Sequence, residues 1–379
     1  MTLPLEPRLR GERVVVVGGG ILGTLHAYLA VAGGAEVVHL ERDPVPAGAS
    51  VRNFGLIWVS GRAPGREFEL ALRARHLWEV IAQDVPGIRF RANGSFTLLA
   101  DDDEVEVARR ATQRPDAARR GFDLMTRAEV LVRNPVVRGQ FIAGLYCERD
   151  AAVESRVALA ALRHALISSG RYRYHAGREL VGVRDGAVVD HRGDVHAGDR
   201  VVLCLGASLT GFARELVESE PLRTVRLQMA ETEPLADPLT TSIANADTFR
   251  YYPHFRADAL EVLAPQEATA VHYAIQLLIQ QRCHGGLTVG DTHEGERPGV
   301  FDAPDRPLDI ILAAARHLIG PAMPRVERRW TGVYHQVDPA RSDEVYLRRD
   351  VASGVTLVTG AGGRGMTLAP AIAEESFRD

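Results

Sequence analysis

The sequence predicts an α/β chain in which a parallel-sheet domain is interleaved with an α+β domain built on an antiparallel sheet. Three observations lead to this prediction. A strand, a glycine-rich turn, a helix and a second strand follow one another near the N-terminus; short strand-like segments fill the centre; and a second group of glycines precedes a helix near the C-terminus. A chain of 379 residues is long enough for two domains.

The first unit, residues 14–41, has every part of a Rossmann-type site for an adenine dinucleotide. Four consecutive valines predict a buried parallel strand. Gly18, Gly20 and Gly23 then follow in the G-x-G-x-x-G spacing, which permits a tight turn, close approach of a pyrophosphate and close packing of helix on strand. The next strand ends at Glu41, which is placed to accept hydrogen bonds from a ribose hydroxyl. The alternative is a chance spacing of glycines.

The composition is that of an ordinary globular protein, with 46% hydrophobic and 25% charged residues. The net charge is −4 and there is no basic block, so neither nucleic acid nor an anionic membrane is expected as a partner. The chain contains no lysine, which excludes Schiff-base chemistry from lysine. Cys147, Cys204 and Cys283 are isolated in sequence, which favours a reducing, cytoplasmic location.

The sequence predicts no targeting segment, no membrane span and no metal site. Arg8, Arg10 and Arg13 precede an apolar run, as in a secretory signal, but the glycine motif lies inside that run, so we assign it to the fold. The sequence contains no uninterrupted run of 18 apolar residues, so no membrane span is predicted. The 13 histidines show no metal-ligand spacing, so no metal is expected; His293 and His335 are the two of most interest.

The remaining elements follow from periodicity and turn residues. Residues 42–62 are expected to form an ordered loop, and Thr126 and Glu129 to form a capping box. Helices are predicted at residues 67–85, 101–120, 155–169, 308–319 and 366–375. Strands are predicted at residues 89–100, 141–148, 171–189, 199–205, 326–334 and 355–359. The central block, 221–300, is expected to form an antiparallel sheet from strands at 225–230, 249–254, 259–263, 273–280 and 287–289.

Together these features resemble the FAD-dependent amine oxidoreductases of the D-amino acid oxidase family, with glycine oxidase and sarcosine oxidase as nearer relatives. The resemblance runs from Arg13 to Glu375. Its strongest stretches are VVVVGGGILG…HLE at 14–41, GASVRNFG at 48–55, VVLCLGAS at 201–208, LTVGDTHE at 287–294, RWTGVY at 329–334 and VTGAGGRGMTLAP at 358–370. ASVRNFG and GDTHE are similar to a subgroup that is sometimes encoded beside genes for phosphonate breakdown.

The resemblance implies the FAD fold of D-amino acid oxidase and glutathione reductase. It also implies a division of the chain. The FAD-binding domain would be discontinuous and comprise residues 1–85, 141–215 and 326–379. The substrate-binding domain would comprise residues 86–140 and 216–325.

The cofactor implied by the resemblance is FAD. The residues that would bind it are Gly18, Gly20, Ile21, Leu22, Gly23, Glu41, Arg42, Ser50, Arg52, Asn53, Leu180, Gly206, Ala207, Gly332, Gly363, Arg364, Gly365, Met366, Thr367 and Leu368. Sarcosine oxidase attaches its flavin to a cysteine in the segment that matches RWTGVY. The matching residue here is Gly332, so non-covalent FAD is predicted.

The substrate site departs from the family pattern. Tyr334 stands where glycine oxidase holds the substrate carboxylate with an arginine, and this chain lacks the lysines that sarcosine oxidase uses. Other cations are available at Arg52, Arg250 and Arg364. Two converging arginines would suit a phosphonate, because guanidinium pairs bidentately with such oxygens. We therefore hypothesise an aminoalkylphosphonate substrate, N-methylated or not, ahead of glycine, sarcosine or D-alanine.

The candidate catalytic residues are Arg52, Tyr251, His293, Tyr334 and Arg364. The expected reaction is oxidation of a small amine by hydride transfer to FAD, giving an imine that water hydrolyses, with O2 reduced to H2O2. The alternatives are an FAD-dependent dehydrogenase with another acceptor, a nicotinamide-dependent dehydrogenase, and a non-catalytic flavin-binding module. The sequence leaves the oligomeric state open.

Overall fold

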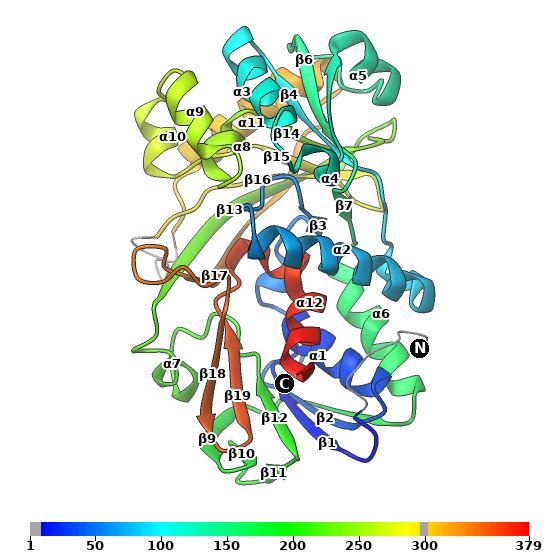
Figure 1. Ribbon diagram of the computed structural model, residues 1–379, viewed down its shortest axis with the longest axis vertical. Coiled ribbons are helices and arrows are strands. Elements are labelled where there is room, and N and C mark those ends of the chain that lie inside the picture. The colour runs from blue at the N-terminus through cyan, green and yellow to red at the C-terminus, as the bar shows by residue number, and fades with distance from the viewer. Residues whose placement is uncertain (1–8, 296–301, 379) are drawn as a thin grey trace.

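The computed structural model describes residues 9–295 and 302–378 (Figure 1). Residues 1–8, 296–301 and 379 of the expected domain segments, Arg8 among them, lie outside the described residues. The chain is α/β, as predicted from the sequence. A six-stranded sheet and an eight-stranded sheet lie at opposite ends of the long axis, and the long strands β13 and β17 run towards the region between them (Figure 1). Where the chain divides into domains stays a prediction.

The six-stranded sheet has the order β18-β19-β12-β1-β2-β8, and of these described strands only β18 is antiparallel to its neighbour. Its strands are β1 (Arg13–Val17), β2 (Glu36–Glu41), β8 (Tyr172–Ala176), β12 (Arg200–Leu203), β18 (Leu347–Ala352) and β19 (Val355–Thr359). The four valines of β1 are buried, because the sheet is covered on both faces.

Four helices of the described chain pack together on one face of this sheet: α1 (Ile21–Ala32), α2 (Arg66–Asp84), α6 (Ser155–Ser168) and α12 (Gly365–Arg378). The other face is covered by a three-stranded antiparallel sheet of β9 (Leu180–Arg184), β10 (Ala187–Asp190) and β11 (Val195–Ala197). Val15 and Leu40 of the parallel strands share a buried cluster with Leu180 and Val188 of this small sheet.

The eight-stranded sheet has the order β17-β13-β16-β15-β14-β4-β6-β5, and among its described strands only β14 and β4 pair in parallel. Its strands are β4 (Ser95–Leu99), β5 (Phe122–Thr126), β6 (Ala143–Cys147), β13 (Leu222–Pro234), β14 (Ser242–Asn245), β15 (Leu278–Gln281), β16 (Gly286–Gly290) and β17 (Val326–Val337). The described helices that accompany this sheet are α3 (Asp102–Thr112), α4 (Ala117–Arg120), α5 (Arg127–Arg133), α8 (Asp247–Tyr251), α9 (Arg256–Val262), α10 (Ala268–His272) and α11 (Asp305–Ile319).

Short elements complete the described part of the chain. These are β3 (Leu56–Ile57), which pairs with β7 (Ala151–Ala152), the helix α7 (Phe212–Glu215), and the single turns η1 (Ala49–Val51), η2 (Pro86–Ile88), η3 (Gly320–Ala322) and η4 (Gly362–Arg364). The capping box at α5 is confirmed: the Thr126 hydroxyl accepts from the Glu129 amide, and the Glu129 carboxylate accepts from the Thr126 amide.

Two strands predicted in the central block, 249–254 and 259–263, are wrong, because the chain there forms α8 and α9. Phe249, Tyr252, Phe255 and Ala259 are all buried: Phe249 lies in α8, Ala259 lies in α9, and Tyr252 and Phe255 flank the turn between the two helices. The Phe249 and Phe255 rings lie 4.6 Å apart. Tertiary packing therefore selects the helical conformation of this aromatic segment.

Several predicted boundaries also differ from those of the structure, two of them for a clear physical reason. The helix expected over 101–120 is broken into α3 and α4, since Pro115 between them cannot donate a backbone hydrogen bond. The strand expected over 273–280 is reduced to Leu278–Gln281, because α10 and a turn occupy the preceding residues.

The glycine turn after β1 packs tightly against α1 and the end of β12. Gly18 has φ +107°, a conformation that disfavours any residue with a side chain. An ideal Cβ at residue 23 would lie 1.9 Å from the Gly18 carbonyl oxygen, and one at residue 18 would lie 2.1 Å from the Cys204 carbonyl oxygen. The turn can approach α1 and the end of β12 this closely only because residues 18 and 23 have no side chain.

We predict that Gly23→Ala destabilises the protein by about 3 kcal/mol, the upper end of the usual cost of overpacking, because the obstructing atom is backbone. Urea unfolding followed by circular dichroism measures this loss. Gly48→Ala is the control, since a Cβ there meets nothing within 4 Å and φ is −80°. Equal stability of the two variants would contradict the tight contact.

Candidate active site

A cavity of about 1000 Å³ extends from the carboxyl ends of β1 and β2 to α8, α9 and α10. Ligands of open parallel sheets commonly bind outside these strand ends. Most of the predicted site residues line it, although their positions span the whole chain: Gly18, Gly20, Ile21, Leu22, Glu41, Arg42, Ser50, Arg52, Asn53, Leu180, Gly206, Ala207, Tyr251, His293, Gly332, Tyr334, Gly363, Arg364, Gly365 and Met366. Folding thus brings the separate motifs to one space.

Three predicted cofactor residues do not line the cavity. Gly23 lies beneath the turn, against the Gly18 carbonyl. The Thr367 hydroxyl accepts a hydrogen bond from the Trp58 amide at 2.9 Å, and the Leu368 side chain is fully buried in the core. These residues support the walls of the cavity.

One end of the cavity has the geometry of an anion site at the start of α1. Gly20 precedes the helix without a side-chain cap, and the Ser50 hydroxyl accepts from the Ile21 amide at 2.9 Å. The Glu41 carboxylate accepts from the amides of Gly19 and, at 2.7 Å, Asp43. A carboxylate has about four acceptor positions, so two of those on Glu41 remain for a ribose.

The loop that carries Ser50 is rigidly held. The Asn53 amide donates to the carbonyls of Ala49 and Ser50, at 2.9 and 3.0 Å. Arg52 donates to the carbonyls of Ala47 and Thr331, at 2.7 and 2.9 Å. These bonds tie the loop to β17 and engage the Arg52 guanidinium with backbone.

A buried arginine that sequence reasoning missed, Arg282, holds the same loop from the other side. It donates to the Asn53 carbonyl at 2.7 Å and pairs with Glu154 at 2.9 Å. Burial lowers the pKa of Arg282, whereas the Glu154 carboxylate opposes the shift. No local sequence pattern marks this residue, since its partners come from distant segments.

The second glycine cluster forms η4 and the start of α12, where backbone can approach a flat ligand. An ideal Cβ at residue 332 would lie 3.0 Å from Leu227 Cδ1, and one at residue 363 would lie 3.4 Å from the Tyr334 hydroxyl. Two helix starts, α1 and α12, thus meet one cavity, and the missing side chains leave space there. This arrangement fits FAD, which has a pyrophosphate for one end and a flat ring for the other.

Beyond this region the cavity is lined by two arginines that share one carboxylate. Arg62 Nη1 and Arg364 Nη1 lie 3.6 and 3.5 Å from the two oxygens of Glu67. Arg62 and Glu67 are buried, and the Arg364 side chain is only 17% exposed. Burial lowers the pKa of Arg364, an effect that Glu67 opposes. The cluster therefore carries a net positive charge.

Arg62, which the sequence analysis did not identify, is positioned by buried contacts. Its Nε donates to the Trp58 carbonyl at 2.7 Å, and its guanidinium lies 5.7 Å from the Tyr252 ring centre. The buried Asp150 carboxylate accepts from the amides of Val59 and Ser60, at 2.6 and 2.9 Å. The segment that carries Arg62 is thus fixed.

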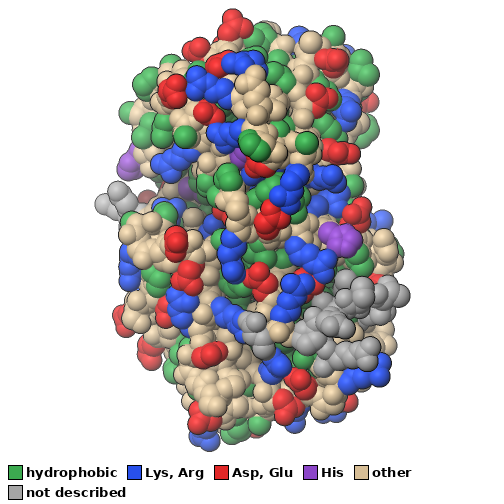
Figure 2. Space-filling view, in the orientation of Figure 1, with side chains coloured by type: hydrophobic (Ala, Val, Ile, Leu, Met, Phe, Trp, Pro, Cys, Tyr) green, Lys and Arg blue, Asp and Glu red, His purple; other side chains and the backbone are tan. Residues whose placement is uncertain are grey.

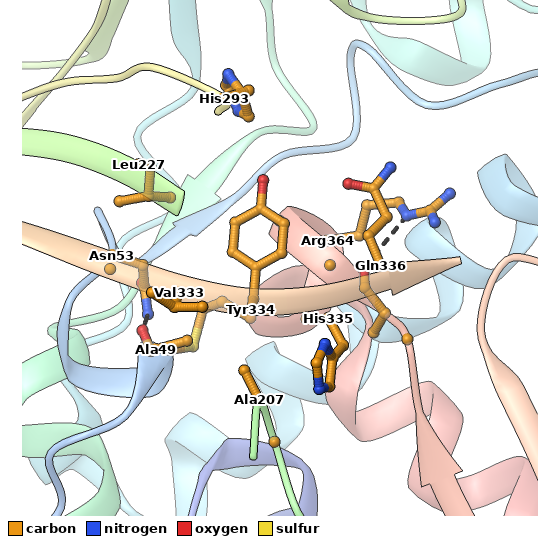
Figure 3. Close-up of a pocket in the computed structure, with 18 of the residues that line it drawn as sticks. Ala49, Asn53, Ala207, Leu227, His293, Val333, Tyr334, His335, Gln336 and Arg364 are labelled. Atoms are coloured by element: carbon orange, nitrogen blue, oxygen red, sulfur yellow. Dashed lines mark hydrogen bonds between the residues drawn. The ribbon is translucent and has the colours of Figure 1, made fainter. Parts of the chain in front are cut away.

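An aromatic group lies next to the arginines. Tyr251 stacks on His293 with ring centres 4.1 Å apart. The Tyr334 hydroxyl is buried and has no hydrogen-bond partner among the described residues, and in Figure 3 it points away from β17 on the side where His293 lies. Burial raises the pKa of both tyrosines, so both are neutral hydrogen-bonding groups.

The three cations predicted from the sequence do not form one anion site. Arg250 donates to the Ala264 carbonyl at 2.6 Å and lies 3.7 Å from Asp247, while Arg52 is engaged with backbone. Of the three, Arg364 is the one joined by another arginine in the described structure, and its partner is Arg62. Which arginine binds the anion of the substrate stays a prediction.

Within residues 9–295 and 302–378, no three histidine, cysteine, aspartate or glutamate side chains are grouped to hold a metal ion. In the same part of the chain no helix has both the length and the apolar character to cross a membrane. Charges of both signs are interspersed over the face in Figure 2, without a large basic area among its described residues.

Comparison with known proteins places this geometry in context. An opine oxidase subunit from Rhizobium meliloti is 24% identical over 388 positions, which cover 97% of this chain and 94% of the relative. Glycine oxidase from Geobacillus kaustophilus has a similar structure, with TM-score 0.75, 18% identity and coverage of 96% and 93% of the two chains. Iminodiacetate oxidase from Chelativorans sp. BNC1 also has a similar structure, with TM-score 0.72, 17% identity and coverage of 97% of this chain and 94% of that chain.

The similarity to these solved structures confirms the predicted fold. The cofactor is confirmed by a match to a family model. The model described as FAD dependent oxidoreductase (DAO) matches residues 13–376, nearly the whole chain. This is the span over which the glycine turn, the acid at the end of β2 and the C-terminal glycine cluster meet one cavity. The chain belongs to the DAO family and is an FAD-dependent oxidoreductase.

Proposed function

We propose that this enzyme oxidises a small amine that carries an acidic group, and that O2 is the final electron acceptor, giving H2O2. The observation that carries the proposal is the continuity of one cavity from the α1 glycine turn to the buried Arg62–Glu67–Arg364 cluster. Support also comes from relatives whose names contain glycine and iminodiacetate, both of which are amines with carboxylates.

We assign FAD to the glycine-lined part of the cavity. The α1 start and Ser50 would lie at the pyrophosphate, and Glu41 at the adenosine ribose. Gly332, Gly363 and the α12 start would lie at the ring. When bound, FAD supplies a two-electron acceptor for the hydride of the substrate carbon.

The chain's own residues would hold the substrate and exclude water. The substrate's acidic group would pair with Arg62 and Arg364, and the hydroxyl groups of Tyr251 and Tyr334 would face it. Loss of hydride from the carbon next to nitrogen gives an imine, which water hydrolyses. Positioning within van der Waals contact of the acceptor atom is the main contribution of such a site.

The charge of the cluster bears on the substrate class. Two guanidinium groups and one carboxylate leave one net positive charge, which suits a single carboxylate better than a dianionic phosphonate. We therefore place amino acids ahead of aminoalkylphosphonates, the reverse of the order expected from the sequence. A reducing, cytoplasmic location stays a prediction.

A substrate panel tests the proposal. Holoenzyme is assayed for peroxide release with sarcosine, glycine, D-alanine, iminodiacetate and aminomethylphosphonate, with an artificial electron acceptor run in parallel. Turnover of at least one amino acid is expected. Turnover with the artificial acceptor alone would identify a dehydrogenase, the alternative favoured by the L-proline dehydrogenase likeness. No turnover of any amine would refute the proposal.

Arg62→Met and Arg364→Met should each raise KM for the best substrate ten- to a hundredfold, because a charged hydrogen bond contributes about 1.5–3 kcal/mol. Arg306→Met, at an arginine whose side chain is 67% exposed, is the matched control. An unchanged KM in both cavity variants would show that the anion binds elsewhere.

FAD is predicted to be non-covalent, because Gly332 occupies the position at which sarcosine oxidase attaches its flavin. Acid precipitation of the yellow protein should leave FAD in the supernatant. Flavin retained in the pellet would contradict this prediction.

Glu41→Ala should weaken FAD binding ten- to a hundredfold through loss of a charge-assisted hydrogen bond. Fluorescence titration of the apoprotein measures the affinity. Glu36→Ala is the control, since Glu36 is exposed at the other end of β2. Equal affinities would show that Glu41 serves only the turn, through Gly19 and Asp43.

A further inference from the structure

A buried acid lies in the same cavity and has no use in the mechanism so far. Asp291 follows β16, lines the cavity and is 5% exposed. One carboxylate oxygen accepts from the Gln276 amide at 3.1 Å, and the other lies 3.7 Å from His293 Nε2. The backbone amides of Asp291 and Gln276 donate to each other's carbonyls, so the carboxylate is held in place.

The hydrogen bonding of His293 leaves room for one proton beside Asp291. Its Nδ1 lies 3.1 Å from the Ala274 carbonyl oxygen, which can only accept, so Nδ1 carries the hydrogen. Its Nε2 faces the second Asp291 carboxylate oxygen at 3.7 Å. This separation is longer than a direct hydrogen bond, so the two atoms are near each other without being bonded.

His293 is the basic side chain beside Asp291, and no arginine of the described residues forms an ion pair with this carboxylate. Tyr251, stacked on His293, and Tyr334 on β17 are neutral. Arg226 and Glu294 neutralise each other in a 2.5 Å ion pair.

Arg62 and Arg364, which line the same cavity, share Glu67, and Arg223 also lines the cavity. Burial is the main cause that raises the pKa of Tyr251; the charge of Asp291 adds to the rise, and those of Arg364 and Arg62 oppose it. The acid and the arginines thus border one space.

A buried carboxylate without a cation is unfavourable unless a ligand provides the charge. Burial raises the pKa of Asp291, which His293 opposes. An asparagine could keep the bond to Gln276 without this cost. A cationic ligand would explain why an acid is buried here. The ammonium group of an amino acid would face Asp291, and its carboxylate would face Arg62 and Arg364 in the same cavity.

We propose that Asp291, assisted by His293, binds the ammonium group of the substrate and accepts its proton before the hydride is transferred. One N–H bond breaks, its electrons remain on nitrogen as a lone pair, and the proton moves to the site between the Asp291 oxygen and His293 Nε2. The nitrogen lone pair would then form the C=N bond as the C–H electron pair is lost as hydride, for which bound FAD would supply the acceptor. This inference rests on the proposed function and specifies the substrate as a primary or secondary amine bound as the cation.

The first test is the rate of flavin reduction on anaerobic mixing with the best amine, for native holoenzyme and Asp291→Asn, between pH 6 and 10. The native rate should be nearly constant around neutral pH. The variant should be about 100-fold slower at pH 7, the lower range for general bases, and should recover as pH rises, because solution supplies the free amine. His293→Gln should show a smaller loss with the same pH trend.

Asp309→Asn, at an exposed carboxylate on α11, is the control and should match native holoenzyme. A loss in Asp291→Asn that is the same at every pH, or no loss, would overturn the proposal.

The second test does not need turnover. Sarcosine and (methylthio)acetate, in which sulfur replaces the nitrogen, are titrated into holoenzyme and followed by the flavin absorbance. Asp291→Asn should weaken sarcosine binding tenfold or more and leave (methylthio)acetate unchanged. Equal effects on both probes, or no binding of either by the native protein, would overturn the inference. If no amine is oxidised and the selective loss of sarcosine still occurs, the proposed function fails and Asp291 as the ammonium site stands.

Discussion

The fold depends on one steric constraint, the contact of α1 with the turn that follows β1. The Gly18 carbonyl occupies the position that a side chain at residue 23 would need, and the Cys204 carbonyl occupies the position of one at residue 18. Two glycines therefore allow β1, α1 and β12 to converge, and this convergence points the start of α1 into the cavity. The start of a helix favours an anion through its dipole and backbone amides, and the Ser50 hydroxyl and Glu41 carboxylate accept from two of these amides here.

The cavity is a property of the two sheets together. Its floor comes from the parallel sheet and its helices, while Tyr334, Gln276 and Asp291 come from β17 and the strands around β16. Arg282 connects these halves by bonding to the 48–55 loop from the end of β15. Buried arginines of this kind fix geometry because each requires several acceptors, which only the folded arrangement provides.

Charges of both signs line the cavity. Arg62 and Arg364 with Glu67 make one wall positive, Asp291 is a buried acid on another wall, and Tyr251 interacts with both. In a buried space such charges interact more strongly than in water. A zwitterionic or ammonium-bearing acid is the ligand that would satisfy both walls at once, which unites the substrate proposal with the assignment of Asp291.

The sequence by itself determined the parallel-sheet unit and predicted a dinucleotide site there, because the G-x-G-x-x-G turn and the acid at the end of β2 are local patterns with a fixed spacing. FAD was predicted from the family resemblance, and the family model confirms it. The strands predicted at 249–254 and 259–263 were wrong, because the spacing of the aromatic residues there fits both a strand and a helix. Only the packing of the folded protein selects the helices α8 and α9. Only the tertiary structure shows that Arg364 shares Glu67 with Arg62, and that Asp291 is buried between Gln276 and His293. Arg62 and Glu67 are far from Arg364 in sequence, and long-range contacts of buried charges leave no periodic signal in the chain.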